Sequence, residues 1–407
     1  MALFDSDRHE ELLQVRWDEG SARRAIETIA RDCEARFSPE GLWPAHPLDH
    51  EGSPPDAPYA GLFFGAAGVI DALDRLAHCG FARSTARFVP VLAALEERVA
   101  RELDSRDVSI ESYLIGRSGI LLARCLIEPS PEAADRLAHS IAANTDHPTR
   151  ELMWGAPGTM HAALAMYEST REARWAELYR SGARSLARSL EPHDGWSLWT
   201  QEIWNRRLVM LGAAHGFTGN AGAIVRGLGL LEPAERRAWI DRIVNATLAT
   251  ARREGELANW APEWPASGRV KWLVQWCHGA PGFVTSLATL EDRRLDDVLR
   301  AAGELIWTAG PLVKGAGLCH GTAGNGYAFL KLFRRTGDER WLERARAFAM
   351  HAIVQSERHA AEYGMRRYSL YTGDPGLAIY LMRCIDATDA WPGLDREGPP
   401  ADEGAAV

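Results

Sequence analysis

Two kinds of helical pattern alternate along the chain. One kind is apolar on almost every side, as in VIDALDRLAHC after Gly68 and YAFLKLFRR after Gly326. The other kind is amphipathic, with apolar residues three and four apart and Arg and Glu between them, as in 86–104, 174–191 and 340–360. A helix that is apolar all round is buried, whereas an amphipathic helix covers a core. The alternation therefore predicts pairs of inner and outer helices.

A Gly-x-x-Gly element opens each of the apolar helices. Its seven copies start at Gly65, Gly116, Gly155, Gly216, Gly279, Gly321 and Gly373. A single copy would mark only a turn, but seven copies at equivalent places indicate a structural repeat. Glycine permits close backbone approach, so an inner helix can begin abruptly at a crowded rim. We therefore predict an all-α fold, an α/α toroid (barrel) of seven inner and seven outer helices.

The repeat also defines the expected domain organisation. Residues 1–386 should form one toroid domain, because repeats extend a fold without dividing it. Residues 387–407 are rich in Pro, Gly and acidic residues, so we expect a disordered tail. The first-turn N–H groups of the inner helices should face one rim, a usual place for anionic ligands. Two Trp-rich stretches, 192–206 and 259–276, either wall a cleft at this rim or cap the ring.

Composition narrows the function classes. The 407 residues carry a formal net charge of -9, with Arg interspersed among Glu, so we expect no nucleic-acid partner. The polar start of the chain is unlike a secretory signal, and no apolar run is long enough for a membrane span. The six cysteines lie far apart, as buried thiols or metal ligands in the reducing cytosol would. We expect a cytoplasmic monomer, since a closed ring needs no partner.

Two neighbouring units carry cysteine next to the glycine element. One reads WCHGAPG, with Cys277, and the next reads LCHGTAGN, with Cys319 and His320. Equivalent positions of neighbouring repeats lie side by side, so these three side chains should converge. Two thiolates and one imidazole leave one tetrahedral position open, as in catalytic zinc sites. His278 is an alternative fourth ligand that would close the site. If no metal binds, the two cysteines are simply buried core residues.

Other polar residues share the same rim. His215 directly precedes the glycine of its unit in AAHGFTG, and an imidazole suits proton transfer at neutral pH. A hydrogen-bonded core histidine is the alternative. Glu151 in ELMWGAPG adds a carboxylate, and Lys314, five residues before Cys319, adds a cation. His215, Glu151 and Lys314 are therefore our candidate catalytic residues.

These motifs resemble the lanthionine synthetase C family, including its LanC-like members. WCHGAPG, LCHGTAGNGYAFL and AAHG match the most specific motifs of the family, and SLYTGDPGLAIYL resembles its last repeat. The resemblance runs from about Tyr59 to Arg383. It implies the same ring of seven inner and seven outer helices.

The resemblance implies one zinc ion per chain, bound by Cys277, Cys319 and His320, with a thiol substrate as the fourth ligand. It also implies acid–base catalysis by His215. Bacterial cyclases of the family add a peptide cysteine to dehydroalanine or dehydrobutyrine and so close a thioether ring. LanC-like members bind glutathione and are associated with adding it to dehydroamino acids in proteins.

Three features resemble the LanC-like branch more than the cyclases. Glu151 stands where the cyclases carry an essential Asp, Lys314 matches a position that glutathione-binding members use, and His278 follows the first cysteine. Thr372 departs from the family, which often has Glu at this position. The roles of Thr372 and of the neighbouring Asp374 therefore stay open.

Several functions agree with these residues. The one that we favour is zinc-dependent addition of glutathione to dehydroamino-acid residues of a peptide or protein. The alternatives are a stand-alone lanthipeptide cyclase that uses a peptide thiol, and a non-catalytic protein that binds zinc and glutathione. A glycosidase on a helical toroid is a more distant reading, for which Glu151 and Asp374 are the candidate carboxylates.

Overall fold

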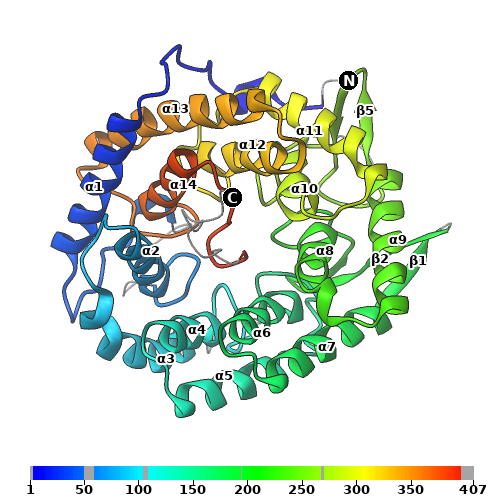
Figure 1. Ribbon diagram of the computed structural model, residues 1–407, viewed down its shortest axis with the longest axis horizontal. Helices are drawn as coiled ribbons and strands as arrows, with labels where there is room; N and C mark the ends of the chain where they lie inside the picture. Colours follow the sequence, from blue (N-terminus) through cyan, green and yellow to red (C-terminus); the bar gives the residue numbers. More distant parts are fainter. Residues whose placement is uncertain (1–2, 50–58, 104–108, 194, 267–269, 396–407) are drawn as a thin grey trace, which may run out of the picture.

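The computed structural model describes residues 3–49, 59–103, 109–193, 195–266 and 270–395. Fourteen α-helices in these residues form two concentric layers (Figure 1). The inner layer consists of α2 (Ala66–His78), α4 (Arg117–Ile127), α6 (Ala156–Thr170), α8 (Phe217–Arg226), α10 (Ala280–Leu287), α12 (Thr322–Thr336) and α14 (Asp374–Asp386). The outer layer consists of α1 (Glu19–Arg36), α3 (Val89–Leu103), α5 (Pro131–Ala143), α7 (Ala173–Arg188), α9 (Pro233–Thr250), α11 (Asp296–Ala309) and α13 (Glu339–Tyr363). The predicted toroid of seven inner and seven outer helices is confirmed.

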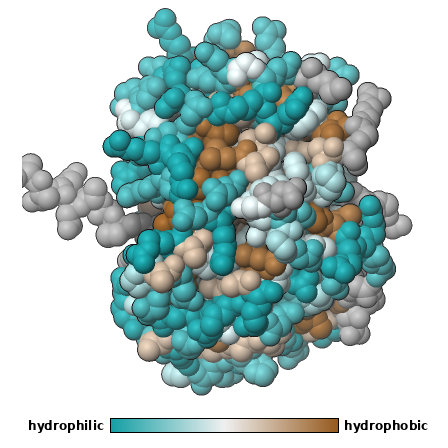
Figure 2. Space-filling model, turned by 90° about the vertical axis from the view of Figure 1, so that its right-hand side faces the viewer, coloured by the Kyte–Doolittle hydropathy of each residue, from teal (hydrophilic) through white to brown (hydrophobic). Residues whose placement is uncertain are grey.

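The two layers differ in burial as the hydrophobic pattern predicts. The inner helix α12 buries every residue from Thr322 to Leu332. The outer helix α7 buries one face, which carries Trp175, Tyr179 and Leu186. Figure 2 faces the side of the ring that carries α9, and apolar side chains there lie mainly in the hollows of a hydrophilic surface. Helix α1 packs against α14 and so closes the ring.

Short elements decorate the ring. Three antiparallel hairpins are formed by β1 (Leu190–His193) with β2 (Trp196–Trp199), β3 (Gln201–Ile203) with β4 (Arg206–Leu208), and β5 (Arg252–Glu254) with β6 (Leu257–Asn259). Single 3-10 turns are η1 (Ser6–Arg8), η2 (Pro47–Asp49), η3 (Thr85–Phe88), η4 (Leu228–Leu230) and η5 (Arg293–Leu295). No helix in the described ranges is both long and apolar enough to cross a membrane.

The loop before an inner helix folds back over the first turn of that helix. Phe217 and Thr218 in α8 donate their N–H groups to loop carbonyls at 2.8 and 3.1 Å, and Thr322 in α12 does the same at 2.9 Å. The second glycine of the unit makes this approach possible, because a Cβ on Gly324 would lie 1.7 Å from the carbonyl oxygen of Leu318. Our expectation of free N–H groups at the rim is therefore wrong for these helices, since the loop already satisfies them.

Backbone hydrogen bonds join equivalent loop positions of neighbouring units. Each donor in this circuit lies five residues before the second glycine of its unit. At 2.7 to 3.4 Å, N–H groups donate to carbonyls from Ala214 to Cys277, Cys277 to Cys319, Cys319 to Tyr371, Tyr371 to Phe63, and Phe63 to Leu114. The repeat thus places the two cysteines next to one another on one circuit.

The chain after α14 differs from the expected disordered tail. Residues 387–395 turn back into the axis of the ring, inside the circle of inner helices (Figure 1). Trp391 is 2% exposed there, and Asp395 accepts a 2.6 Å hydrogen bond from Lys331 Nζ. Aromatic packing and a buried ion pair order this part despite its Pro- and Gly-rich composition. The rest of the expected tail, 396–407, lies outside the described residues.

Candidate metal centre

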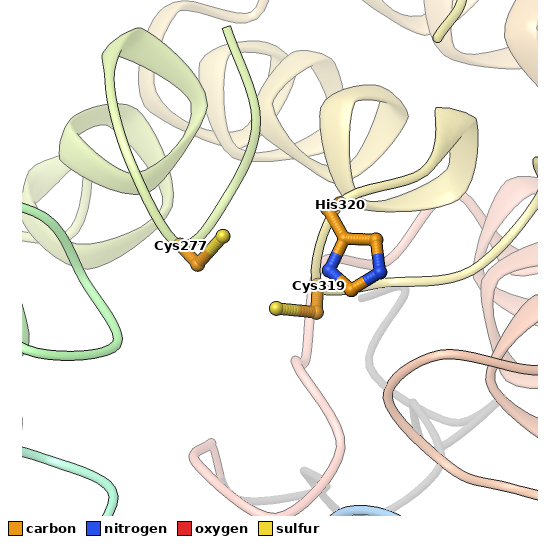
Figure 3. Close-up of side chains that lie close together, drawn as sticks. All are labelled: Cys277, Cys319 and His320. Carbon is orange, nitrogen blue, oxygen red and sulfur yellow. The ribbon is translucent and has the colours of Figure 1, made fainter. Parts of the chain in front are cut away.

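Cys277, Cys319 and His320 meet at the rim where α10 and α12 begin (Figure 3). Their potential ligand atoms all lie within 4.8 Å of one another, and the two cysteine side chains point toward each other. Cys277 and Cys319 are buried, whereas His320 is partly exposed. Within the described ranges this is the only group of three or more such residues that could hold a metal ion.

The chemistry of this group fits zinc. Thiolate and imidazole are the preferred ligands of tetrahedral zinc, and three protein ligands leave one position for a substrate. His278, the alternative fourth ligand, is not part of the group. Its ring instead lies 6.4 Å from the ring of His215. Burial lowers the pKa of His278.

The two thiols influence one another. A hydrogen bond from Cys319 lowers the pKa of Cys277 well below its usual range, and His320 adds to this effect. The same contact, together with burial, raises the pKa of Cys319. One thiol of the pair therefore ionises readily, and full deprotonation of both requires a nearby cation, as metal binding provides.

Gln275 orients one of the two sulfurs. Its Nε2 donates to Cys277 Sγ at 3.0 Å, and its Oε1 accepts from Arg8 Nη2 at 3.2 Å. The sequence analysis did not identify Gln275 or Arg8. A signal was available for Gln275, because it occupies the same place in its unit, seven residues before the second glycine, as Glu151 does in another.

His215 and Glu151 form a hydrogen-bonded pair on the same rim. His215 Nδ1 lies 3.0 Å from Glu151 Oε2. The carboxylate is fully buried and also accepts the N–H groups of Met153 at 2.9 Å and Trp154 at 2.6 Å. Because these bonds leave the carboxylate as the acceptor, Nδ1 carries the proton, and Nε2 is the nitrogen available for proton transfer.

This pair lies where the backbone circuit changes. Met153 stands five residues before Gly158, the position whose N–H joins neighbouring units elsewhere in the ring. Here that N–H is bound by Glu151 instead. The backbone of its own loop therefore holds the Glu151 carboxylate in its orientation toward His215.

The Trp-rich stretches place one ring beside His215 and others in the core. Trp204 is 56% exposed, and its ring centre lies 5.4 Å from that of His215. It therefore forms a wall beside the imidazole. Trp199 and Trp260 are almost fully buried and belong to the core of the ring.

Lys314 lies on the exposed loop before α12 and lines a small cavity with Arg367 and Thr372. The positive charges of Lys314 and Arg367 oppose the increase in the pKa of Cys319. Thr372 Oγ1 donates to Asp49 Oδ1 at 2.6 Å, and Asp49 also pairs with Arg367. A carboxylate from a distant loop thus reaches the position where the family often has Glu.

Asp374, the other carboxylate of the sequence analysis, lies at the first turn of α14. It is buried, and it accepts hydrogen bonds from the hydroxyl of Ser356 and, at 2.8 Å, from the N–H of Arg367. Burial raises the pKa of Asp374. These bonds join α13 to the start of α14, and they share no partner with Glu151. Asp374 therefore anchors the first turn of α14 to α13.

Comparisons with known proteins show the family of this chain. The family model for lanthionine synthetase C-like proteins matches residues 56–396. Glutathione S-transferase LANCL1 of Danio rerio is 40% identical over 114 residues, which is 27% of this chain and 28% of that protein. LanC-like protein GCL1 of Arabidopsis thaliana is 36% identical over 132 residues, 30% of each chain. These matches therefore span less than a third of either relative.

The structure of nisin cyclase has a similar fold. It superposes with a TM-score of 0.63 over 91% of this chain and 96% of that chain, at 15% sequence identity. A likeness at this identity concerns the fold, so it supports the toroid and leaves the substrate open.

Proposed function

The chain belongs to the lanthionine synthetase C-like family, and from this premise we propose that it adds glutathione to dehydroalanine or dehydrobutyrine residues of a peptide or protein. A zinc ion held by Cys277, Cys319 and His320 would activate the thiol. The observation that carries this proposal is the convergence of these three ligands within 4.8 Å. The hydrogen-bonded pair of His215 and Glu151 lies on the same rim.

The three ligands define what the metal would contribute. A free thiol has a pKa of about 8.5, and bound zinc would deprotonate it and keep its sulfur nucleophilic at neutral pH. Cys277, Cys319 and His320 would hold the ion, and a zinc ion with three protein ligands could accept that sulfur as its fourth. Gln275 holds Cys277 by its hydrogen bond, and so orients a ligand from outside the metal site.

His215 would supply the proton that completes the addition. The sulfur forms a bond with Cβ of the dehydroamino acid, and the electron pair of the double bond moves toward Cα and the adjacent carbonyl. His215 Nε2 would take up the proton that the thiol loses on binding, and would then donate it to Cα. Glu151 accepts from Nδ1 and stabilises the imidazolium. The elements of the thiol add across the double bond, and no group leaves.

Charged residues beside Cys319 favour glutathione as the thiol. Glutathione carries two carboxylates, and Lys314 presents an exposed ammonium on the loop that also carries Cys319. The name of the Danio rerio relative supports the same thiol. The reducing cytosol, where glutathione is abundant, fits this chemistry, and a ring closed by α1 against α14 fits a monomer.

A lanthipeptide cyclase is the second candidate, because ring closure is also the addition of a thiol to a dehydroamino acid. It would use the same metal ligands and the same proton donor, but the thiol would belong to the peptide that carries the dehydroamino acid. The two functions therefore differ in the substrate and in whether the thiol comes from a second molecule.

Metal analysis combined with an addition assay tests the proposal. The purified protein is incubated with glutathione and a peptide that contains dehydrobutyrine, and the products are weighed by mass spectrometry. One zinc per chain and a product heavier by one glutathione would support the proposal. Ring closure of a dehydrated peptide with its own cysteine, without a glutathione adduct, would favour the cyclase. Zinc with neither product would favour the non-catalytic alternative, and a protein without zinc would contradict all three.

A further inference from the structure

Residues 390–395, the axial plug, contact the loop that carries the first metal ligand. Trp391 stacks on Trp276 with ring centres 5.0 Å apart and ring planes 19° apart. It also packs against Tyr327 of α12 at 4.8 Å. Trp276 is 1% exposed and directly precedes Cys277. The position of the Cys277 backbone therefore depends on an aromatic surface that the plug completes.

The plug also contacts the segment that fixes the second cysteine. Tyr371 is fully buried, and its hydroxyl donates to the carbonyl of Pro392 at 3.1 Å. The carbonyl of the same tyrosine accepts the N–H of Cys319 at 2.7 Å. The plug thus reaches Cys277 through one residue and Cys319 through another. The two cysteines are joined directly by the bond between Cys277 N–H and the Cys319 carbonyl.

A buried ion pair holds the plug in place. Lys331 of α12 is 2% exposed, and its Nζ lies 2.6 Å from Asp395 and 3.2 Å from Asp389. Burial opposes the charge on Lys331, but the two carboxylates outweigh it, so the pKa of Lys331 is raised. Asp395 also accepts the N–H of Trp391 at 3.0 Å, which ties the end of the plug to its aromatic residue.

We propose that the axial plug positions the two cysteine loops for metal binding, through Trp276 on one side and Tyr371 on the other. This inference rests on the proposed zinc site. Trp391 and Lys331 touch none of the three ligands, so they are positioning residues. Close-packed interiors transmit small shifts, and ligand atoms must lie within a few tenths of an ångström of their ideal distances from zinc.

Substitution of Trp391 tests the inference, with a matched substitution elsewhere as control. Trp391→Ala should weaken zinc binding, measured by chelator competition, by about 10- to 100-fold, as loss of an outer contact to a metal ligand does. Trp341→Ala removes an equally buried indole that packs on Phe329, away from the cysteine loops, and should leave zinc affinity unchanged. The visible absorption of the cobalt-substituted protein should change only for Trp391→Ala. Wild-type affinity and an unchanged cobalt spectrum for this variant would overturn the proposal.

Lys331→Met provides a second test if Trp391→Ala does not fold. This change removes the ammonium that holds Asp395 and Asp389, and leaves Asp395 only its second cation, Arg226, whose Nε lies 3.4 Å away. All the aromatic rings remain, so zinc affinity should fall by less than with Trp391→Ala. An unchanged zinc affinity for Lys331→Met would contradict the role of the plug.

A readout that needs no zinc separates this inference from the proposed function. Phenylarsine oxide bridges two neighbouring thiols with release of water, so its reaction with Cys277 and Cys319 depends on their spacing. A wild-type protein that binds no zinc would contradict the proposed function, and the arsenical would still test the plug. Slower bridging in Trp391→Ala than in wild type would support the plug, and equal bridging would overturn it.

Discussion

At the scale of single residues, the buried carboxylate of Glu151 is stabilised by the groups that it binds. Its carboxylate has no contact with solvent, yet both oxygens are bound, by two backbone N–H groups and by His215. A buried charge without such partners would be strongly destabilising. The backbone N–H groups hold the carboxylate in one orientation, and the carboxylate in turn holds the imidazole of His215 by its hydrogen bond. We therefore assign Glu151 a positioning role that acts through His215.

Glu151→Gln should lower kcat while the zinc content stays the same. The amide has only one acceptor oxygen and no negative charge, so it stabilises the imidazolium less. We expect kcat to fall by about 100-fold or more, the usual contribution of general acid–base catalysis. Steady-state kinetics of glutathione addition and metal analysis of the same samples check this. Glu151→Asp, which keeps the carboxylate, should recover part of the rate. An unchanged kcat in the Gln variant would contradict the assigned role.

At the scale of elements, the loop before each inner helix sets the geometry of the site. Its backbone lies against the first turn so closely that the second glycine cannot carry a side chain, as the contact between Gly324 and the Leu318 carbonyl shows. The same loop presents Cys319 and His320 to the rim. The glycines of the repeat are therefore required by the site as well as by the fold.

Gly324→Ala should destabilise the protein. The added Cβ would lie 1.7 Å from the Leu318 carbonyl oxygen, and backbone atoms cannot yield easily, so we expect a loss of about 3 kcal/mol or more in the free energy of unfolding. Gly229→Ala is the control, because a Cβ there meets no atom within 4 Å. Urea unfolding of both variants measures the difference. Equal stabilities would mean that the loop is not packed as described.

The repeat explains how much of this structure could be predicted from the sequence. The glycine element and the alternating helices indicated the toroid, and the cysteines in equivalent places indicated their convergence. Asp49 and the axial plug could not be foreseen, because they belong to no repeat. Asp49 binds Thr372, which lies 323 residues away in the sequence. The composition of residues 390–395 is typical of a disordered tail, although Trp391 is buried in the core.

At the scale of the whole molecule, residues 387–395 lie in the axis of the ring and bury titratable groups there. His161 of α6 is 8% exposed, and its Nδ1 donates to the carbonyl of Leu394 at 3.0 Å. Burial, with a smaller effect of Arg226, lowers the pKa of His161 from 6.5 to about 4. The folded protein therefore favours the neutral form of the His161 imidazole.

This burial predicts a dependence of stability on pH. Between pH 6.5 and about 4 the unfolded chain binds a proton at His161 and the folded chain does not, so stability falls as the pH is lowered through this range. The contribution of His161 approaches about 1.4 kcal/mol per pH unit. Urea unfolding of wild type and His161→Gln at several pH values isolates it, since the other groups are common to both. The variant should have the shallower slope, and identical slopes would contradict the prediction.

The zinc content of the wild-type and Cys277→Ala proteins, measured alongside glutathione addition to a dehydrobutyrine peptide, tests the central claim most directly. Cys384→Ala, a buried cysteine outside the ligand group, is the control. We expect one zinc per chain and a glutathione adduct for wild type and for the control, and neither for Cys277→Ala, because two ligands cannot hold the ion tightly. Stoichiometric zinc in Cys277→Ala, or full activity without zinc, would contradict the account.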